Sequence, residues 1–262
     1  MYKKKIIFQN LFRKIINNKD RRLISKNKGL EKEIISYIKN SKSTGCNYSD
    51  YLAIYSYIRK NKPKSILECG TGVSTIVMAH ALVENEKEGV LGKIISMESI
   101  DEYYEMAKKI MPDHFAPYVD LKLSPLIEDY YSIYRGIRYR DIPMDREYDF
   151  LFIDGPSYES ELDGTLAFNF DLLHVVKNSE NPVSAIIDKR VSSCYVFQKI
   201  FGTNKVKYNP YTHLGYVNSV TKYDIKHFDI ITPSSAFEDT FNLIGNSKLH
   251  LNFPHFLFKK DN

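Results

Sequence analysis

The chain has 262 residues, of which 43% are hydrophobic and 26% are charged. These fractions are ordinary for a globular protein with a full core, and they exclude the collagen-like, low-complexity and disordered classes. The three cysteines, Cys46, Cys69 and Cys194, are odd in number and far apart. They therefore argue against a disulfide framework or a paired-thiolate metal site and favour the reducing cytoplasm.

Positive charge is concentrated in the first part of the chain. Residues 1–28 contain ten Lys or Arg and one acid, Asp20, so their net charge is +9, whereas the whole chain carries +5. The remainder is mildly acidic, and a nucleic-acid enzyme would more often carry a basic stripe across its body. A nucleic-acid partner is therefore not expected.

We interpret the basic segment, residues 1–28, as a solvated helix or arm. The alternative is a weak contact with an anionic membrane or a partner, because several apolar residues recur at helical spacing (Ile6, Ile7, Phe8, Leu11, Phe12, Ile15 and Ile16).

No apolar run approaches the roughly 18–20 residues that span a bilayer. The first ten residues lack both a long apolar stretch and a small-residue cleavage site, so no signal peptide is expected. Together with the cysteine usage, these features predict a cytoplasmic protein.

Apolar periodicity and turn residues predict strands that alternate with helices. Strands are expected at Ser65–Cys69, Lys93–Glu98, Val119–Ser124, Tyr148–Asp154 and Val183–Asp188, with extended segments at Lys205–Tyr208 and Leu214–Val220. Helices are expected at Leu30–Lys39, Asn47–Arg59, Ser74–Glu84, Tyr103–Ile110, Leu162–Val176 and Ser192–Phe201. The segment from Pro125 to Met144 is interpreted as a long, Tyr-rich loop. This alternation predicts a doubly wound α/β fold with a mostly parallel sheet and helices on both faces.

Three parts of the chain are expected. Residues 1–45 form a basic helical extension, residues 46–222 form the α/β domain, and residues 223–262 form an appendage packed on that domain, with aromatic residues near its end.

The most informative stretch runs from Ile66 to Thr75, with the sequence ILECGTGVST. Glycines after the first strand let the backbone approach a ligand at the edge where such sheets bind their ligands. Thr75 stands where a dinucleotide fingerprint has its third glycine. The carboxylate of Glu68 would repel a pyrophosphate and attract an ammonium group.

This stretch resembles the first motif of class I S-adenosylmethionine-dependent methyltransferases, in which an apolar strand ends in acid-x-Gly-x-Gly. Ser74 and Thr75 after the glycines resemble a branch with many small-molecule and sugar O-methyltransferases. The resemblance covers roughly Ser65 to Val220 and implies a seven-stranded, Rossmann-like sheet. It also implies that the methionine part of the cofactor lies against one segment, with Glu68 near the amino group (Glu68, Gly70, Thr71, Gly72, Ser74 and Thr75).

The same resemblance assigns other parts of the cofactor site. Glu98 ends the second strand, where an acid accepts hydrogen bonds from the ribose hydroxyls, and Ser99 follows it. Ser124 closes the third strand and borders the adenine. Asp154 ends the fourth strand, at the catalytic edge.

Asp154 and Asp188 end neighbouring strands, so their carboxylates are expected at one sheet edge. Two acids there could hold Mg²⁺, as in metal-dependent catechol-type O-methyltransferases, although Lys189 stands where those enzymes have a third oxygen ligand. Without a metal, Asp154 or His213 would act as general base while Lys189 stabilises the anion. Tyr158 and His213 are expected to shape the acceptor pocket.

These features predict methyl transfer from S-adenosylmethionine to an oxygen of a small molecule or sugar, including a precursor in surface polysaccharide biosynthesis. A second hypothesis is a catalytically silent methyltransferase-like domain used for binding or assembly. A third, a nicotinamide-dependent oxidoreductase, is disfavoured by Thr75 and Glu68.

Overall fold

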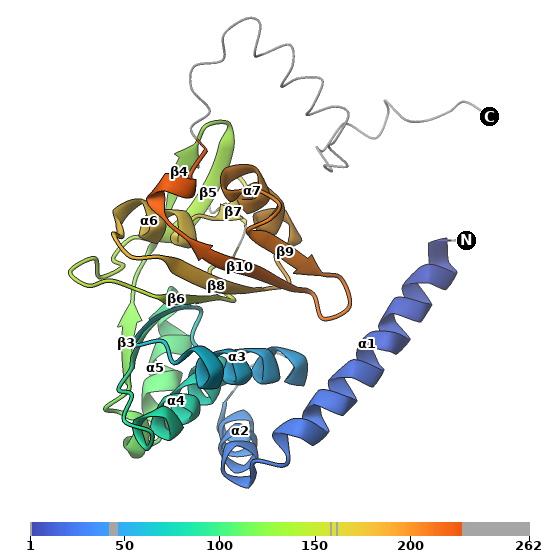
Figure 1. The fold of residues 1–262 in the computed structure, drawn as a ribbon, viewed down its shortest axis with the longest axis vertical. Helices are drawn as coiled ribbons and strands as arrows, with labels where there is room; N and C mark the ends of the chain where they lie inside the picture. The colour runs from blue at the N-terminus through green and yellow to red at the C-terminus, as the bar shows by residue number, and fades with distance from the viewer. Residues whose placement is uncertain (1, 42–46, 158, 161, 227–262) are drawn as a thin grey trace, which may run out of the picture. The chain divides into compact units, whose positions relative to one another are not determined.

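A seven-stranded sheet forms the centre of the fold (Figure 1). The computed structural model describes residues 2–41, 47–157, 159–160 and 162–226. The strands of this sheet are β1 (Ser65–Cys69), β2 (Lys93–Glu98), β3 (Val119–Leu123), β6 (Phe150–Ile153), β8 (Val183–Asp188), β9 (Val206–Asn209) and β10 (Leu214–Val220). Their order is β3-β2-β1-β6-β8-β10-β9, and β10 runs antiparallel to both of its neighbours. The predicted mostly parallel sheet of seven strands is confirmed.

The strand order reverses at β1. The chain adds β2 and β3 on one side of β1 and then crosses to β6 on the other side. In open parallel sheets, ligands bind beyond the carboxyl ends of the strands at such a reversal. The topology therefore places the ligand site beyond Cys69, where the glycine turn begins.

Helices cover both faces of the sheet, as predicted (Figure 1). They are α1 (Tyr2–Ile24), α2 (Lys28–Asn40), α3 (Tyr48–Asn61), α4 (Val73–Glu86), α5 (Asp101–Ile110), α6 (Asp171–Asn178) and α7 (Val191–Phe201). Successive strand residues point to opposite faces. Ile66 of β1 therefore packs in a buried cluster with residues of α2, α3 and α4. Its neighbour Leu67 packs in a second cluster with residues of α6 and α7.

The helices at the start of the chain belong to the same compact unit, which ends at Lys226. Leu30, Ile34 and Tyr37 of α2 are buried in the cluster shared with α3 and α4. Helix α1 contacts α3, and Ile24 at its end is buried in that cluster. Among the described residues, no helix is long and apolar enough to cross a membrane.

The prediction of a loop from Pro125 to Met144 is wrong. Strands β4 (Leu126–Tyr131) and β5 (Tyr134–Tyr139) form an antiparallel hairpin, which β7 (Phe168–Asn169) extends to a three-stranded sheet. Tyr and Ile favour strands. A two-residue turn joins the strands, and Ser132 in this turn has a φ of 54°, the left-handed geometry that tight hairpins need.

The predicted helix from Leu162 to Val176 is also wrong in its first half. Helix α6 begins at Asp171, after the parallel pairing of Phe168 and Asn169 with β5. Gly164 has a φ of 67°, which belongs to a turn and not to a right-handed helix. Apolar spacing alone did not reveal this turn. Tyr158 and the part of the predicted appendage after residue 226 lie outside the described residues.

Candidate active site

A cavity of about 330 Å³ opens at the carboxyl ends of β1, β2, β6 and β8. Its size lies at the lower end of the range for small-molecule sites. The residues that line it are Tyr37 of α2; Gly70, Thr71, Gly72, Val73 and Ser74 after β1; Glu98, Ser99 and Ile100 around the end of β2; Tyr103 and Met106 of α5; Tyr139 of β5; Asp154, Gly155, Pro156 and Ser157 after β6; and Lys189 and Arg190 after β8. Eight residues proposed from the sequence therefore share one cavity (Gly70, Thr71, Gly72, Ser74, Glu98, Ser99, Asp154 and Lys189).

Gly70 brings the glycine turn against the end of β6. Its φ is +100°, and a Cβ atom there would lie 2.8 Å from the backbone nitrogen of Gly155. Both features require glycine at this position. The turn then leads into α4, whose first residues, Val73 and Ser74, line the cavity.

Glu68 lies beneath this turn, fully buried, and does not line the cavity. Ser74 donates a hydrogen bond to Oε1 of its carboxylate at 2.5 Å, and Thr75 and Ser96 donate to Oε2 at 2.6 and 2.5 Å. Burial raises the pKa of Glu68 to about 7, although the three hydroxyls oppose the shift. In this arrangement the carboxylate holds the glycine turn to the neighbouring strand, whereas the sequence suggested that it faces a ligand's ammonium group.

Glu98, in contrast, lines the cavity with an ordered carboxylate. Its Oε1 accepts hydrogen bonds from the backbone nitrogens of Ser99 at 2.7 Å and Ile100 at 3.0 Å. Burial nevertheless raises the pKa of Glu98 above its usual range. The two amides fix the orientation of the carboxyl group, which can therefore accept hydrogen bonds from the hydroxyls of a ligand in a set direction.

Arg190 fastens the end of β6 to the end of β8. Its guanidinium donates hydrogen bonds to the carbonyl oxygens of Asp154, Pro156 and Asp188, the last at 3.0 Å, and its Nη1 lies 3.4 Å from Oδ1 of Asp154. Asn169 adds bonds from its side-chain nitrogen to the carbonyls of Gly155 and Pro156, at 3.2 and 3.3 Å. The segment that carries Asp154 into the cavity is thus held from two sides.

Three carboxyl groups interact electrostatically at this edge: those of Asp154, Asp188 and Asp50. Asp188 is fully buried, and its Oδ2 accepts a hydrogen bond from Nζ of Lys189 at 2.8 Å. Burial and the charge of Asp154 raise the pKa of Asp188 to about 6. Burial and the charge of Asp188 raise the pKa of Asp50, in α3, to about 7. Asp154 is the member of this group that lines the cavity.

The acids at this edge do not fit a divalent metal ion. Lys189 pairs with Asp188, and Arg190 lies against Asp154, so a cation already faces each carboxylate where Mg²⁺ would need free oxygen ligands. Within the described ranges there is also no group of three or more His, Cys, Asp or Glu suited to a metal. The two-aspartate metal site therefore finds no support in the side chains around it.

His213 and Ser124 do not line the cavity. His213 lies in the turn between β9 and β10, where its carbonyl oxygen accepts a hydrogen bond from the backbone of Lys189 at 2.9 Å. Burial, and then the charges of Arg13 and Lys189, lower the pKa of its imidazole. Ser124 is buried, and its hydroxyl accepts a bond from the backbone of Asp141 at 2.9 Å. It orders the chain around β4 and does not face the cavity.

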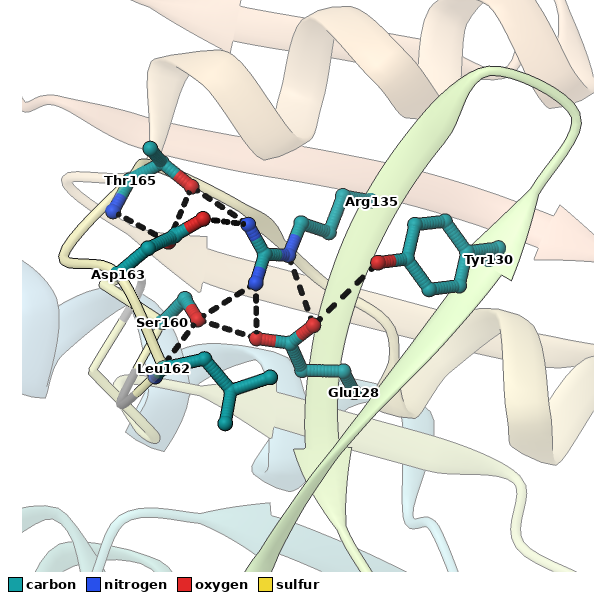
Figure 2. Close-up of polar contacts among 7 residues, drawn as sticks. All are labelled: Glu128, Tyr130, Arg135, Ser160, Leu162, Asp163 and Thr165. Carbon is teal, nitrogen blue, oxygen red and sulfur yellow. Dashed lines mark hydrogen bonds and ion pairs between the residues drawn. The ribbon is translucent and has the colours of Figure 1, made fainter.

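A polar cluster holds the loop after the cavity to the β4–β5 hairpin (Figure 2). Arg135 of β5 lies at its centre and binds Glu128 of β4 with two hydrogen bonds. The same guanidinium donates to Asp163 and Thr165 at 2.7 Å and to Ser160 at 2.8 Å. The loop begins at Ser157 in the cavity wall, so this Arg135 clamp fixes its far end.

Several polar residues of this region were not proposed from the sequence: Tyr37, Tyr103, Tyr139 and Arg190, which line the cavity, and Asp50, which interacts with Asp188. Arg190 follows Lys189 directly after a predicted strand, so its place at the same edge could have been found. Tyr103 is the first residue of the helix predicted after Glu98, so it could have been found in the same way. Tyr37 and Asp50 precede the first strand, and Tyr139 lies in the missed hairpin, so only tertiary structure brings them to the cavity region.

No family model and no curated protein sequence matches the chain. Among solved structures, it is similar to the O-methyltransferase TomG from Streptomyces achromogenes in complex with SAM, with 15% identity over 72% of this chain and 89% of that chain and a TM-score of 0.46. It is also similar to the SAH-bound methyltransferase PaMTH1 from Podospora anserina, with 10% identity over 73% and 87% and a TM-score of 0.48. A third is a putative protein-L-isoaspartate O-methyltransferase from Plasmodium falciparum in complex with S-adenosyl-L-homocysteine, with 10% identity over 56% and 62% and a TM-score of 0.35. The solved structures that this chain is similar to thus include methyltransferases bound to the methyl donor or its product.

Proposed function

We propose that the chain is a class I S-adenosylmethionine-dependent methyltransferase that methylates an oxygen of a small molecule or sugar. The observation that carries this proposal is the cavity at the strand reversal, where the glycine turn after β1 and the ordered carboxylate of Glu98 face the same space. Both features occupy the positions that the sequence motif assigns to the methionine and ribose parts of the cofactor.

The residues present fit S-adenosylmethionine. Gly70 and Gly72 leave backbone without side chains along one wall, so the amino-acid end of the cofactor can lie close to the chain. Glu98, oriented by two backbone amides, suits a pair of ribose hydroxyls as a hydrogen-bond acceptor. Glu68 supports this wall from beneath and does so through the hydroxyls of Ser74 and Ser96.

S-adenosylmethionine supplies a methyl group on a sulfonium, and its transfer forms a carbon–oxygen bond while the carbon–sulfur bond breaks and its electron pair stays on sulfur. The acceptor hydroxyl must lose its proton in this reaction, and Asp154 is the carboxylate in the cavity that can take it. Lys189, also in the wall, places positive charge where the acceptor oxygen becomes negative. Arg190 holds the backbone of Asp154 and so keeps the base in place.

An acceptor screen tests this proposal. Purified chain is incubated with S-adenosylmethionine and pools of sugars, sugar phosphates, phenols and isoaspartyl peptides, and S-adenosylhomocysteine formation is measured. The proposal predicts turnover with a sugar or phenol pool, which Asp154→Asn abolishes. Asp145→Asn is the matched control, because Asp145 is exposed, pairs with Arg146 and does not line the cavity. Turnover with the isoaspartyl peptides alone would contradict the proposed acceptor and indicate a protein substrate. Cofactor binding without turnover in any pool would favour a catalytically silent domain.

A further inference from the structure

Helix α2 contributes a wall of the cavity, although it precedes the glycine turn by about 30 residues of sequence and lies outside the motif. Tyr37, near its end, lines the cavity together with the glycine turn and Glu98. The side chain is nearly buried, with 4% of its surface exposed. The basic segment at the start of the chain therefore leads into a helix that forms part of the candidate site.

The position of α2 is fixed by core contacts. Leu30, Ile34 and Tyr37 recur at helical spacing and are buried against α3 and α4. At the start of the helix, the side chain of Asn27 accepts a hydrogen bond from the backbone of Leu30 at 3.1 Å. The same side chain donates to Glu84 of α4 at 2.9 Å. Because α4 also carries the glycine turn at its start, α2 and this turn are attached to one rigid element.

The phenol of Tyr37 is a neutral hydrogen-bond donor in this position. Burial, and then the charges of Glu68 and Glu98, raise the pKa of the hydroxyl above its usual range. An aromatic ring in a cavity wall can pack against apolar atoms of a ligand, while its hydroxyl donates a hydrogen bond to a polar atom of the same ligand. The amino-acid carboxylate and the ribose of S-adenosylmethionine both offer oxygen acceptors.

We infer that Tyr37 is a cofactor-binding residue and that α2 completes the S-adenosylmethionine site from outside the central sheet. This inference rests on the proposed function. It means that α2 takes part in cofactor binding through Tyr37.

The test compares affinities for S-adenosylhomocysteine by calorimetric titration of the full chain. Tyr37→Phe removes only the hydroxyl, and Tyr37→Leu also removes the ring while keeping an apolar side chain toward the core. The account predicts about three- to tenfold weaker binding for Tyr37→Phe, the effect of one hydrogen bond. For Tyr37→Leu it predicts a loss of about ten- to a hundredfold, because the ring contacts are lost as well.

Tyr57→Phe is the matched control. Tyr57 lies in α3, its ring stacks on Phe150 with centroids 4.3 Å apart, and it does not line the cavity. Thermal unfolding of each variant establishes that it is folded at the temperature of titration. If the wild type binds S-adenosylhomocysteine and both Tyr37 variants bind it with the same affinity, this inference is overturned and the proposed function still stands. Absence of binding by the wild type would instead overturn the proposed function, and with it this inference.

Discussion

Gly70 and Gly155 meet backbone to backbone where β1 and β6 end. A Cβ atom on Gly70 would lie 2.8 Å from the nitrogen of Gly155, and a Cβ atom on Gly155 would lie 2.8 Å from the Cα of Gly70. The two glycines line the same cavity. Their contact sets the spacing between the segment proposed to bind the cofactor and the segment that carries Asp154.

This contact predicts an unequal response to alanine at two glycines with positive φ. Gly70→Ala should lower the free energy of unfolding by about 2–4 kcal/mol, from left-handed strain and from overpacking against Gly155. Gly89→Ala is the control, because its φ is +82° but a Cβ atom there would meet nothing within 4 Å. It should cost about 1–2 kcal/mol, from strain alone. Denaturant unfolding measures both values, and equal losses would contradict the steric role of the contact.

Removal of the Arg190 side chain should loosen the catalytic edge. Arg190→Met removes the guanidinium donor from the carbonyl oxygens of Asp154, Pro156 and Asp188, of which Pro156 keeps its bond from Asn169, at an expected cost of about 2–4 kcal/mol. Arg146→Met is the matched control, because Arg146 pairs with the exposed carboxylate of Asp145. Thermal unfolding should show a lower midpoint for Arg190→Met and little change for the control. A midpoint equal to that of the wild type would show that Arg190 does not hold the two strand ends together.

The raised pKa of Glu68 should make the free energy of unfolding fall as the pH rises. Its pKa is about 7 in the folded chain against an ordinary value of 4.5, so the folded state holds the proton more tightly than the unfolded state. The stability linked to this group is therefore greatest below pH 4.5 and is lost as the pH rises to about 7, by up to about 3 kcal/mol. Glu68→Gln should remove this part of the pH dependence. Urea unfolding of both proteins at about pH 5 and about pH 8 measures it, and parallel losses in wild type and variant would count against a protonated Glu68.

The Arg135 clamp predicts local opening without loss of cofactor binding. Arg135→Met removes the bonds to Glu128, Ser160 and Asp163, so hydrogen exchange in the loop that follows Ser157 should become faster (Figure 2). Affinity for S-adenosylhomocysteine should stay unchanged, because the clamp lies outside the cavity wall. Arg140→Met, which breaks a pair with the adjacent Asp141, should leave the exchange as in the wild type. Unchanged exchange in Arg135→Met would show that other contacts order the loop.

Local sequence patterns predicted the central sheet well, because its four inner parallel strands are short apolar runs that end in an acid or are followed by a glycine or an acid (β1, β2, β6 and β8). Glu98 ends β2 and Asp154 directly follows β6, and both line the same cavity, because the ends of parallel strands converge at one sheet edge. The hairpin of β4 and β5 was missed because its many tyrosines and charged residues give no clear alternation. Tyr37 could not be placed, because its position depends on how α2 packs against α4. The sequence did not indicate the three hydroxyls, from α4 and β2, that bind the buried carboxylate of Glu68.

The measurement that tests the central claim most directly is calorimetric titration of the full chain with S-adenosylhomocysteine, with NAD⁺ as the comparison nucleotide. The account predicts one site per chain with micromolar affinity, and at least about tenfold weaker binding in Glu98→Ala, because the ribose loses its charged acceptor. NAD⁺ should not bind. Tight binding of NAD⁺, or no binding of S-adenosylhomocysteine by a folded wild-type chain, would contradict the account.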